Sequence, residues 1–162
     1  MEDDDNGMVP LTDPKEHSVG GAWGHLLRRC VHLGMVVIPW IYYEHAADLA
    51  TRVGLSSAEQ FASGLVLLLI VAEAVRLRTG ITVFGQRDYE ATQVSALAWG
   101  ALAIGVVLLT LHDHPELGYP LIFSLALGDP LLGELRRAGQ GNRTASMWAS
   151  LVLIGVWSAF AV

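Results

Sequence analysis

The sequence predicts an all-α integral membrane protein, built as a bundle of about five transmembrane helices. Three observations predict this fold class. The chain is 52% hydrophobic and only 16% charged, whereas a soluble domain is closer to one quarter charged. Its apolar residues gather in five runs, at residues 31–43, 61–77, 94–111, 119–132 and 147–162. These runs are rich in Ala, Leu and Gly and lack the alternation of a strand, so each indicates a helix.

The first three runs differ in how well their lengths match a membrane. A straight spanning helix needs about 20 residues, with about 17 as the lower limit. Residues 61–77 and 94–111 reach that limit unaided. The first run reaches it only by extending into residues 23–29 or 44–47.

The fourth run is the weakest, with about 14 residues by the same criterion. Pro120 stands near its start and Gly128-Asp129-Pro130 near its end. We therefore expect this helix to be short, or broken at Gly128–Pro130. Such a broken helix is tolerated in a membrane where it lines protein or a cavity. The fifth run, 147–162, predicts a last helix.

Acidic residues dominate the start of the chain. Residues 1–16 carry six carboxylates and one lysine, whereas the rest of the chain has ten carboxylates and nine arginines and is almost neutral. The start has little apolar surface to bury. We therefore expect an acidic disordered tail over residues 1–20 and a single transmembrane helical domain over residues 21–162.

Arginines indicate the side of the membrane that each connection faces. All arginines except Arg52 lie before the first run, from the end of the second run to the start of the third, or between the fourth and fifth runs. Such positive segments mark the cytoplasmic side. We therefore expect the N-terminus and these connections in the cytoplasm, with the chain integral to the cell membrane. Asp129 is then expected at the same face as most of the arginines.

Several functional classes are disfavoured by composition. One cysteine, Cys30, excludes an internal disulfide. No basic patch with interleaved aromatic residues indicates nucleic acid as a partner, and no cleavable signal peptide is visible. His112-Asp113-His114 resembles a metal-binding motif, but it is expected in the opposite loop, where we interpret it as a solvated turn.

Polar residues at the entrance of the first run have two explanations. Arg29 and His32 are three residues apart and share a helix face. Arginines at the entrance of a span, such as Arg28 and Arg29, are ordinary topology anchors. His32 lies just inside, where a ring nitrogen can bond to a phosphate or a carboxylate.

The segment that follows the second run concentrates charge and glycine. Glu73 and Arg76 are spaced i,i+3, which is typical of a local ion pair. Gly85, Arg87 and Glu90 follow in the connection. Glycine allows a ligand to approach the backbone closely. The connection is therefore a candidate binding loop, although solvated arginines explain this stretch about as well.

Asp129 also has two interpretations. Pro130 could begin a helix, which would make Asp129 its N-cap. Alternatively, Asp129 is a ligand of Mg²⁺, which favours one or two carboxylates together with phosphate oxygens of a substrate. Arginines nearby would clamp the same phosphates. A carboxylate among arginines at a membrane surface suits phosphoryl or nucleotidyl transfer to a lipid.

The order of these motifs resembles the polyprenol kinase family of integral membrane proteins, which includes dolichol kinases and phytol kinases. More distantly, it resembles the membrane cytidylyltransferases that make CDP-activated lipids. The resemblance covers about residues 26–145. The matching residues are Arg28, Arg29 and His32; Glu73 and Arg76; Phe84, Gly85, Arg87 and Glu90; and Gly128, Asp129, Pro130, Gly133, Arg136 and Arg137.

This resemblance implies a CTP-dependent kinase that uses Mg²⁺ to phosphorylate a prenol lipid such as a polyprenol or phytol. It implies that Asp129 is catalytic and holds the metal, and that His32 or Glu90 orients or deprotonates the hydroxyl. It implies nucleotide binding by Arg76, Arg87, Gly128, Gly133, Arg136 and Arg137. Binding of the lipid or its phosphate is then expected at Arg28, Arg29 and Glu73.

Two other interpretations stay open. The family's last basic motif is followed by Glu-Gly, whereas residues 142–148 read NRTASMW and contain neither. The chain could therefore be a non-catalytic short relative that binds an anionic lipid or a membrane partner through its basic face. A small transporter or channel subunit is disfavoured, because no charge lies clearly at mid-membrane.

Overall fold

The computed structural model describes residues 18–160, and within these residues the fold is all-α, as the sequence predicts. The side chain of Asp129 lies outside the described part of the chain. The elements are α1 (Gly21–Gly34), α2 (Val37–Arg52), α3 (Ala58–Thr79), the short 3₁₀ helix η1 (Asp88–Ala91), α4 (Ala96–Thr110), α5 (Pro115–Arg137) and α6 (Asn142–Phe160). The expected tail, residues 1–20, falls mostly outside the described residues. Its last three residues belong to the fold.

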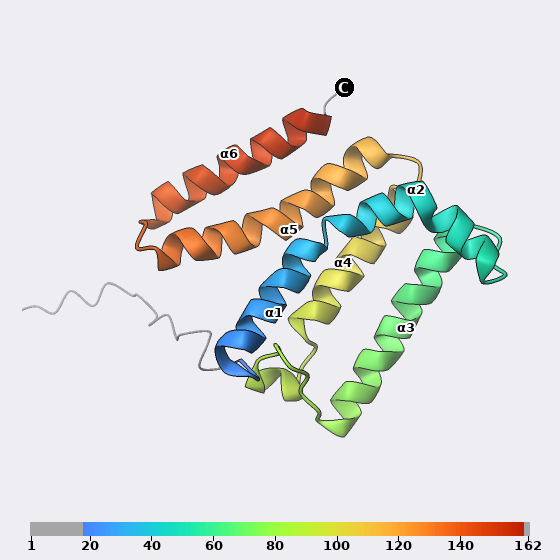
Figure 1. Ribbon diagram of the computed structural model, residues 1–162, viewed down its shortest axis with the longest axis horizontal. Coiled ribbons are helices and arrows are strands. Elements are labelled where there is room, and N and C mark those ends of the chain that lie inside the picture. The colour runs from blue at the N-terminus through green and yellow to red at the C-terminus, as the bar shows by residue number, and fades with distance from the viewer. Residues whose placement is uncertain (1–17, 161–162) are drawn as a thin grey trace, which may run out of the picture.

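The first apolar run is divided between two helices. α1 ends at Gly34, α2 begins at Val37, and the two meet at an angle (Figure 1). Pro39 explains the division, since in a continuous helix its ring would clash with the carbonyl of Met35 and leave that carbonyl without a partner. The Met35 carbonyl instead accepts the N–H of Ile38 at 3.1 Å, which tightens the turn.

The prediction that the fourth helix is short or broken at Gly128–Pro130 is wrong. α5 is continuous over 23 residues and contains both Pro120 and Pro130. It packs along α6, where a Cβ on Gly128 would lie 3.3 Å from Leu153 Cδ2. We attribute the continuity to this packing, because tertiary contacts override local propensity. Asp129 therefore lies inside a helix, and its interpretation as an N-cap is wrong as well.

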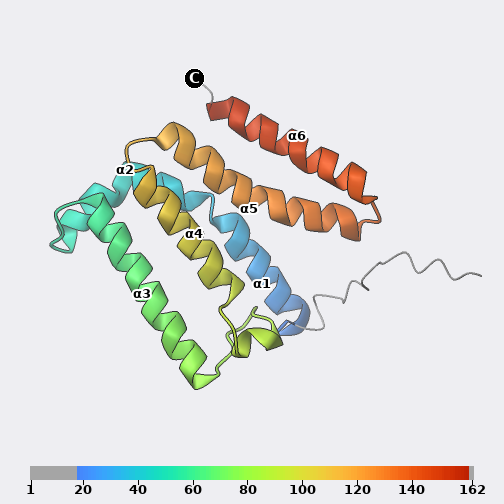
Figure 2. The same cartoon turned by 180° about the vertical axis from the view of Figure 1, so that it is seen from behind.

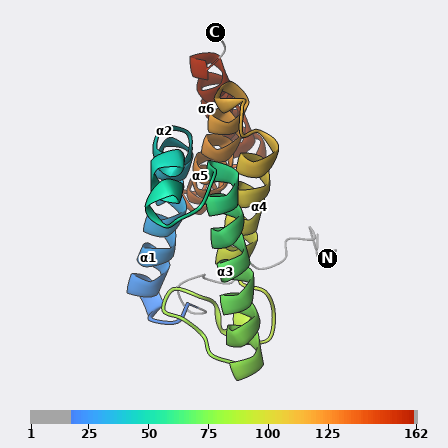
Figure 3. The same cartoon turned by 90° about the vertical axis from the view of Figure 1, so that its right-hand side faces the viewer.

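The helices form two antiparallel pairs joined by a central core. α5 lies beside α6, and α3 lies beside α4 (Figures 1 and 2). α1 and α2 stand on one side, with α3 and α4 on the other (Figure 3). Apolar residues of four helices fill the space between them. The buried core cluster comprises Met35, Tyr42, Ala46, Ala62, Ile104, Leu108, Ile122 and Ala126.

Large apolar side chains cover much of the outer surface. Leu67 and Leu68 of α3 are 62% and 65% exposed, and Trp99 of α4 is 60% exposed. Among the described helices, only α3 is both long and apolar enough to cross a membrane, while α4 is a shorter apolar helix. The all-α fold class is therefore established, and the arrangement of five spans remains a prediction.

Arginine-bearing segments lie at one end of the molecule. The start of α1, the loop after α3 and the α5–α6 turn face the lower left of Figure 1. The α2–α3 and α4–α5 turns lie toward the upper right. All arginines except Arg52 belong to the first set of segments or to the helix ends beside them. This end also carries the largest cluster of polar side chains described below.

Candidate functional site

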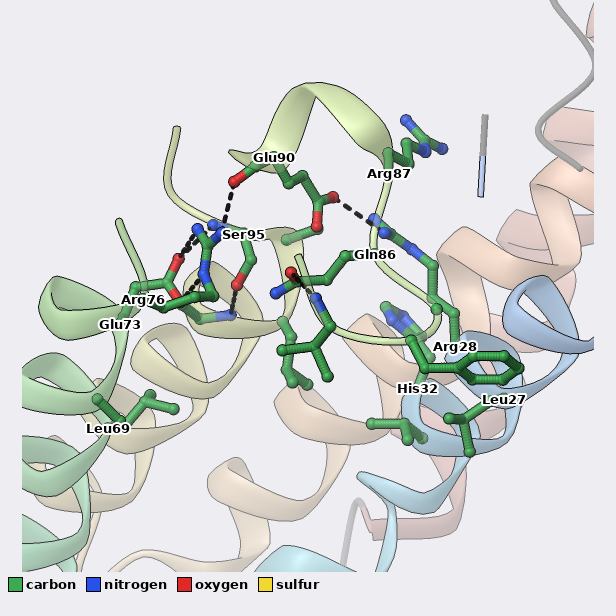
Figure 4. Close-up of a pocket in the computed structure, with 18 of the residues that line it drawn as sticks. Leu27, Arg28, His32, Leu69, Glu73, Arg76, Gln86, Arg87, Glu90 and Ser95 are labelled. Atoms are coloured by element: carbon green, nitrogen blue, oxygen red, sulfur yellow. Dashed lines mark hydrogen bonds and ion pairs between the residues drawn. The ribbon is translucent and has the colours of Figure 1, made fainter. Parts of the chain in front are cut away.

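A pocket of about 530 Å³ lies between α1, α3 and α4, beneath the loop that joins α3 to α4. Its lining is divided by polarity (Figure 4). Most charged and polar side chains lie next to the loop, where the apolar Val83 and Phe84 also line the pocket, and the other apolar side chains lie along the helices. The polar residues are Arg28, His32, Glu73, Arg76, Gln86, Arg87, Glu90 and Ser95. The apolar residues include Leu27, Val31, Met35, Leu69, Ala72 and Leu97.

Arg76 fastens this loop to α3. Its Nε and Nη2 donate to the two carboxylate oxygens of Glu73, at 2.8 and 2.7 Å. Its Nη1 donates to the carbonyls of Glu90 and Ile81, at 2.6 and 3.2 Å, and Nη2 also donates to Gln93 O at 2.8 Å. The side chain is only 8% exposed. All five N–H groups of the guanidinium are thus engaged by protein acceptors, which suits a positioning role rather than a phosphate clamp.

Glu73 connects this network to α4. Beyond its ion pair with Arg76, its Oε1 accepts the backbone N–H of Ser95 at 2.6 Å. Ser95 Oγ in turn accepts the N–H of Ala98 at 3.1 Å and caps the start of α4. The i,i+3 pair expected from the sequence is therefore present, and it also sets where the next helix begins.

The other side of the loop docks on the start of α1. Gly85 N donates to Val19 O at 2.9 Å, and Val19 N donates to Gln86 O at 2.8 Å. Gly85 has a φ of +89°, which favours glycine. A Cβ on Gly85 would lie 2.9 Å from the carbonyl of Gly24. Two glycines therefore allow the loop and α1 to touch backbone to backbone.

Glu90 is a buried carboxylate at the polar end of the pocket. It is 2% exposed, and its Oε1 accepts Arg28 Nη1 at 2.9 Å. Its Oε2 is buried and has no hydrogen-bond partner among the described residues. An unsatisfied buried acceptor is costly, and such groups concentrate at catalytic and binding sites. Oε2 is therefore a buried acceptor without a partner, in a residue that lines the pocket.

His32 and Arg87 lie on either side of the pocket. His32 Nε2 is 3.1 Å from Leu125 O of α5. Because a carbonyl can only accept, this contact assigns the hydrogen to Nε2 and leaves Nδ1 as an acceptor in the neutral ring. The guanidinium of Arg87 contacts the hydroxyl of Tyr89, and its central carbon lies 5.7 Å from the centre of the Tyr89 ring.

A second polar cluster lies between α1 and α5, outside the pocket lining. Arg29 pairs with Glu134, and Arg137 pairs with the same carboxylate at 3.1 Å. Both arginines also contact His25 Nε2, at 3.1 and 3.0 Å. Arg29 and Arg137 were expected to bind lipid phosphate and nucleotide with the other arginines. The structure instead places them in this α1–α5 cluster.

The remaining candidate residues also lie away from the pocket lining. Gly128 packs against Leu153, Gly133 has open space around its Cα, and Arg136 is exposed near the end of α5. The side chain of Asp129 is outside the described part of the chain. The structure thus brings together His32, Glu73, Arg76, Arg87 and Glu90 with Arg28. It separates Arg29, Gly128, Gly133, Arg136 and Arg137 from them.

Sequence reasoning missed three residues that shape the site. Gln86 is 7% exposed, and its Oε1 accepts the N–H of Val83 at 2.8 Å within the loop. Ser95 caps α4, and Gly24 allows the loop to approach α1. Gly20-Gly21 and Gly24 form a visible cluster before the first apolar run, and it was the available signal for that close approach.

The described residues do not form a ready-made metal site. No group of three or more His, Cys, Asp or Glu side chains among them is placed to hold a metal ion. Both oxygens of Glu73 are engaged by Arg76, which leaves Glu90 as the pocket-lining carboxylate with an unpaired, buried oxygen. The residues present therefore do not fit a Mg²⁺ site by themselves.

No family model, curated protein or solved structure matches this chain. The arrangement of its own residues is therefore the basis for a functional proposal. That arrangement can accept a hydroxyl proton at Glu90, place positive charge beside it through Arg28 and Arg87, and enclose an apolar group below.

Proposed function

We propose that this chain is a membrane-embedded, CTP-dependent kinase that phosphorylates the hydroxyl of a prenol lipid resembling a polyprenol or phytol. The single observation that carries the proposal is the division of the pocket into a mainly polar end, with a buried carboxylate oxygen that has no partner, and an apolar end. A lipid alcohol has the same division. The motif order that resembles polyprenol kinases supplies the reaction and the nucleotide.

Glu90 is the base in this proposal. The lipid hydroxyl donates to Glu90 Oε2, and its oxygen attacks the γ-phosphorus of CTP. The bond from that phosphorus to the bridging oxygen breaks, CDP leaves, and the hydroxyl proton passes to Glu90. His32 Nδ1 is the second acceptor that can orient the hydroxyl. General-base catalysis of this kind contributes roughly 10²–10⁴ in rate.

The arginines have different roles in the proposal. Arg87 and Arg28 supply positive charge at the polar end of the pocket, where phosphate oxygens are favoured. Arg76 and Glu73 hold the loop in place and bind no substrate, because protein groups occupy their hydrogen-bonding atoms. Mg²⁺ enters the proposal only through Asp129, and no step is assigned to the metal.

The membrane arrangement is part of the same proposal. α1 and α2 together make the first span, and α3, α4, α5 and α6 make the other four. The exposed apolar side chains of α3, α4 and α6 then face lipid. The pocket lies at the arginine-bearing end, which is cytoplasmic by the positive-inside rule, so CTP reaches it from the cytoplasm.

Phosphoryl transfer in isolated membranes tests this function. Membranes carrying the wild-type chain are incubated with γ-labelled CTP, Mg²⁺ and a panel of prenols. We expect a labelled prenol phosphate from the wild type and none from Asp129→Asn, because asparagine lacks the charge that attracts a metal ion. No transfer by the wild type from CTP or any other nucleotide, to any prenol, would overturn the proposal.

A second candidate is the non-catalytic relative that binds an anionic lipid or a membrane partner. The saturation of Arg76 and the absence of a metal-binding cluster among the described residues favour it. Saturable binding of an anionic lipid, combined with no phosphoryl transfer and no CTP binding, would support this candidate over the kinase.

A further inference from the structure

A second pocket of about 250 Å³ continues from the first along the same helices. Its lining is almost wholly apolar and comes from α2, α3 and α4. Leu69 of α3 lines both pockets, so the two are neighbours along this helix. We call the second pocket the apolar groove; it is lined by residues that include Ile38, Tyr42, Leu65, Ala101, Ile104 and Leu108.

Helical spacing explains why the two pockets are neighbours. On α3, Leu69, Leu65 and Phe61 are four residues apart and share one face. On α4, Ala98 lines the first pocket, and Ala101, Gly105 and Leu108 line the groove at spacings of three and four. The same faces of these two helices therefore run from the polar loop toward the opposite end of the molecule.

Small residues on α4 create the room in the groove. Ala101 presents only a methyl group to it, and Gly105 presents none. A Cβ on Gly105 would lie 2.4 Å from Val66 Cγ2, so this glycine also lets α3 and α4 pack closely beside the groove. A larger residue at Ala101 would fill space that is now open.

We propose that the apolar groove holds the isoprenoid tail of the lipid whose hydroxyl lies at Glu90. This inference rests on the proposed function and names the class of its substrate more closely. The occupant is a hydrocarbon chain, because the groove offers no charged group and its only hydroxyl, that of Tyr42, is buried. The head is fixed at the other end by the polar residues of the first pocket.

The combined length of the first pocket and the apolar groove along α3 determines how much of the isoprenoid tail is enclosed. From Glu73 to Phe61, α3 advances twelve residues, or about 18 Å. An extended carbon chain advances about 1.3 Å per bond, so about fourteen chain carbons fit along this length. That length falls between the main chains of farnesol and geranylgeraniol. Shorter alcohols such as geraniol leave the far part of the groove empty, and longer polyprenols extend beyond it.

Photo-crosslinking tests where the tail lies. A farnesol analogue with a diazirine at the tail end is illuminated with the full-length chain in nanodiscs, and the labelled residues are mapped. We expect labels at Ile104 or Leu108, which line the groove and are only 3% and 5% exposed. Labels confined to outward-facing residues such as Leu67 and Leu68 would overturn the inference. The readout needs no phosphoryl transfer, so it succeeds or fails independently of the kinase assay.

A matched pair of substitutions tests the same point by binding. Ala101→Phe fills the groove, whereas Ala103→Phe adds the same side chain at an exposed position of α4. We expect Ala101→Phe to weaken farnesol binding by about tenfold or more while geraniol binding changes little, since overfilling excludes only the longer tail. Ala103→Phe should bind both alcohols as the wild type does.

Folding of the filled variant is checked separately. Ala101→Leu, a milder filling, is measured alongside, together with the thermal stability of each variant. A folded Ala101→Phe or Ala101→Leu variant that binds farnesol as tightly as the Ala103→Phe control contradicts the inference. Graded weakening from Leu to Phe with unchanged geraniol binding supports it.

Discussion

At the scale of single residues, Arg76 holds the site together, because its hydrogen bonds all go to protein groups. Its five hydrogen bonds reach Glu73 and three carbonyls of the loop, over a sequence separation of up to 17 residues. A phosphate clamp needs free N–H groups, whereas a positioning residue needs occupied ones. Arg76 meets the second condition.

Replacing Arg76 by lysine should destabilise the fold. Lysine keeps the charge but cannot place five donors in one plane. The loop carbonyls then lose partners in a buried site, and each buried acceptor left without a partner costs about 1–3 kcal/mol. We expect a clear fall in the thermal unfolding temperature in detergent. Arg78→Lys, at an exposed position two residues away, is the control and should change little.

The opposite result would revise the role of Arg76. If Arg76→Lys unfolds at the wild-type temperature but loses CTP binding, then Arg76 acts on the nucleotide and the loop is held by other contacts. A positioning role for Arg76 requires that Arg76→Lys lowers the thermal unfolding temperature.

Residue types predicted only part of this site. The charged members, Arg28, His32, Glu73, Arg76 and Glu90, were visible as polar residues at the ends of apolar runs. The different roles of these residues were not visible in the sequence, because they depend on backbone carbonyls that the loop brings to Arg76. The position of a backbone carbonyl cannot be read from the sequence. The hydrogen bonds from these carbonyls to the Arg76 guanidinium could therefore not be predicted.

At the scale of elements, the contact between the loop and α1 depends on glycine. A Cβ on Gly24 would lie 2.0 Å from Val19 O, and one on Gly85 would lie 2.9 Å from Gly24 O. Both distances are shorter than ordinary contacts, so a substitution at either position must move the backbone. The shape of the pocket's polar end therefore depends on two residues with no side chain.

Gly24→Ala and Gly85→Ala should each destabilise the protein. Overfilling at Gly24 costs about 1–3 kcal/mol, and a left-handed backbone at Gly85 costs a non-glycine residue about 1–2 kcal/mol before any clash. Gly133→Ala is the control: nothing lies near its Cα, and alanine favours a helix by about 1 kcal/mol or less. Thermal unfolding of the three variants in one detergent measures this order. A Gly85→Ala variant as stable as Gly133→Ala would mean that the loop does not dock on α1.

Prolines were the least predictable feature of the elements. Pro130 was expected to break the fourth helix, whereas α5 passes through it and α6 packs alongside. Pro39 received no such expectation, yet the chain turns just before it, between α1 and α2. Each of these prolines lacks the N–H that would bond to the carbonyl four residues earlier. Neighbouring helices decide whether the chain bends or continues, and they are not visible in a local stretch of sequence.

At the scale of the whole molecule, arginine-bearing connections alternate along the chain with connections that hold only Arg52. In the structure the first set lies at one end of the molecule and the second set at the other (Figure 1). The sequence reached the all-α class, because composition and the length of the apolar runs report it directly. It could not give the packing of α5 on α6 or the α1–α5 cluster, since these depend on which helix faces meet. The division of the first run into two helices has the same origin.

Cysteine labelling tests the proposed orientation in the membrane. The single exposed cysteine, Cys30, is first replaced by alanine. Asp88→Cys and Gln140→Cys then probe the arginine-bearing end, and His114→Cys probes the other end; all three positions are exposed. An impermeant reagent applied outside intact cells should label only His114→Cys, because positive segments stay inside. External labelling of Asp88→Cys or Gln140→Cys would reverse or break the proposed arrangement of spans.

The central claim is that the pocket beneath the α3–α4 loop is where the lipid alcohol is phosphorylated. The most direct measurement compares phosphoryl transfer from γ-labelled CTP to a prenol by Glu90→Gln and by Glu134→Gln. Both variants lose one carboxylate, but Glu90 lines the pocket and Glu134 belongs to the α1–α5 cluster. The account predicts that Glu90→Gln lowers transfer by roughly 10²-fold or more, as expected for a lost general base, while its thermal stability stays close to that of Glu134→Gln, which remains active. Equal activity of a folded Glu90→Gln variant and the wild type, or loss of transfer only in Glu134→Gln, would contradict it.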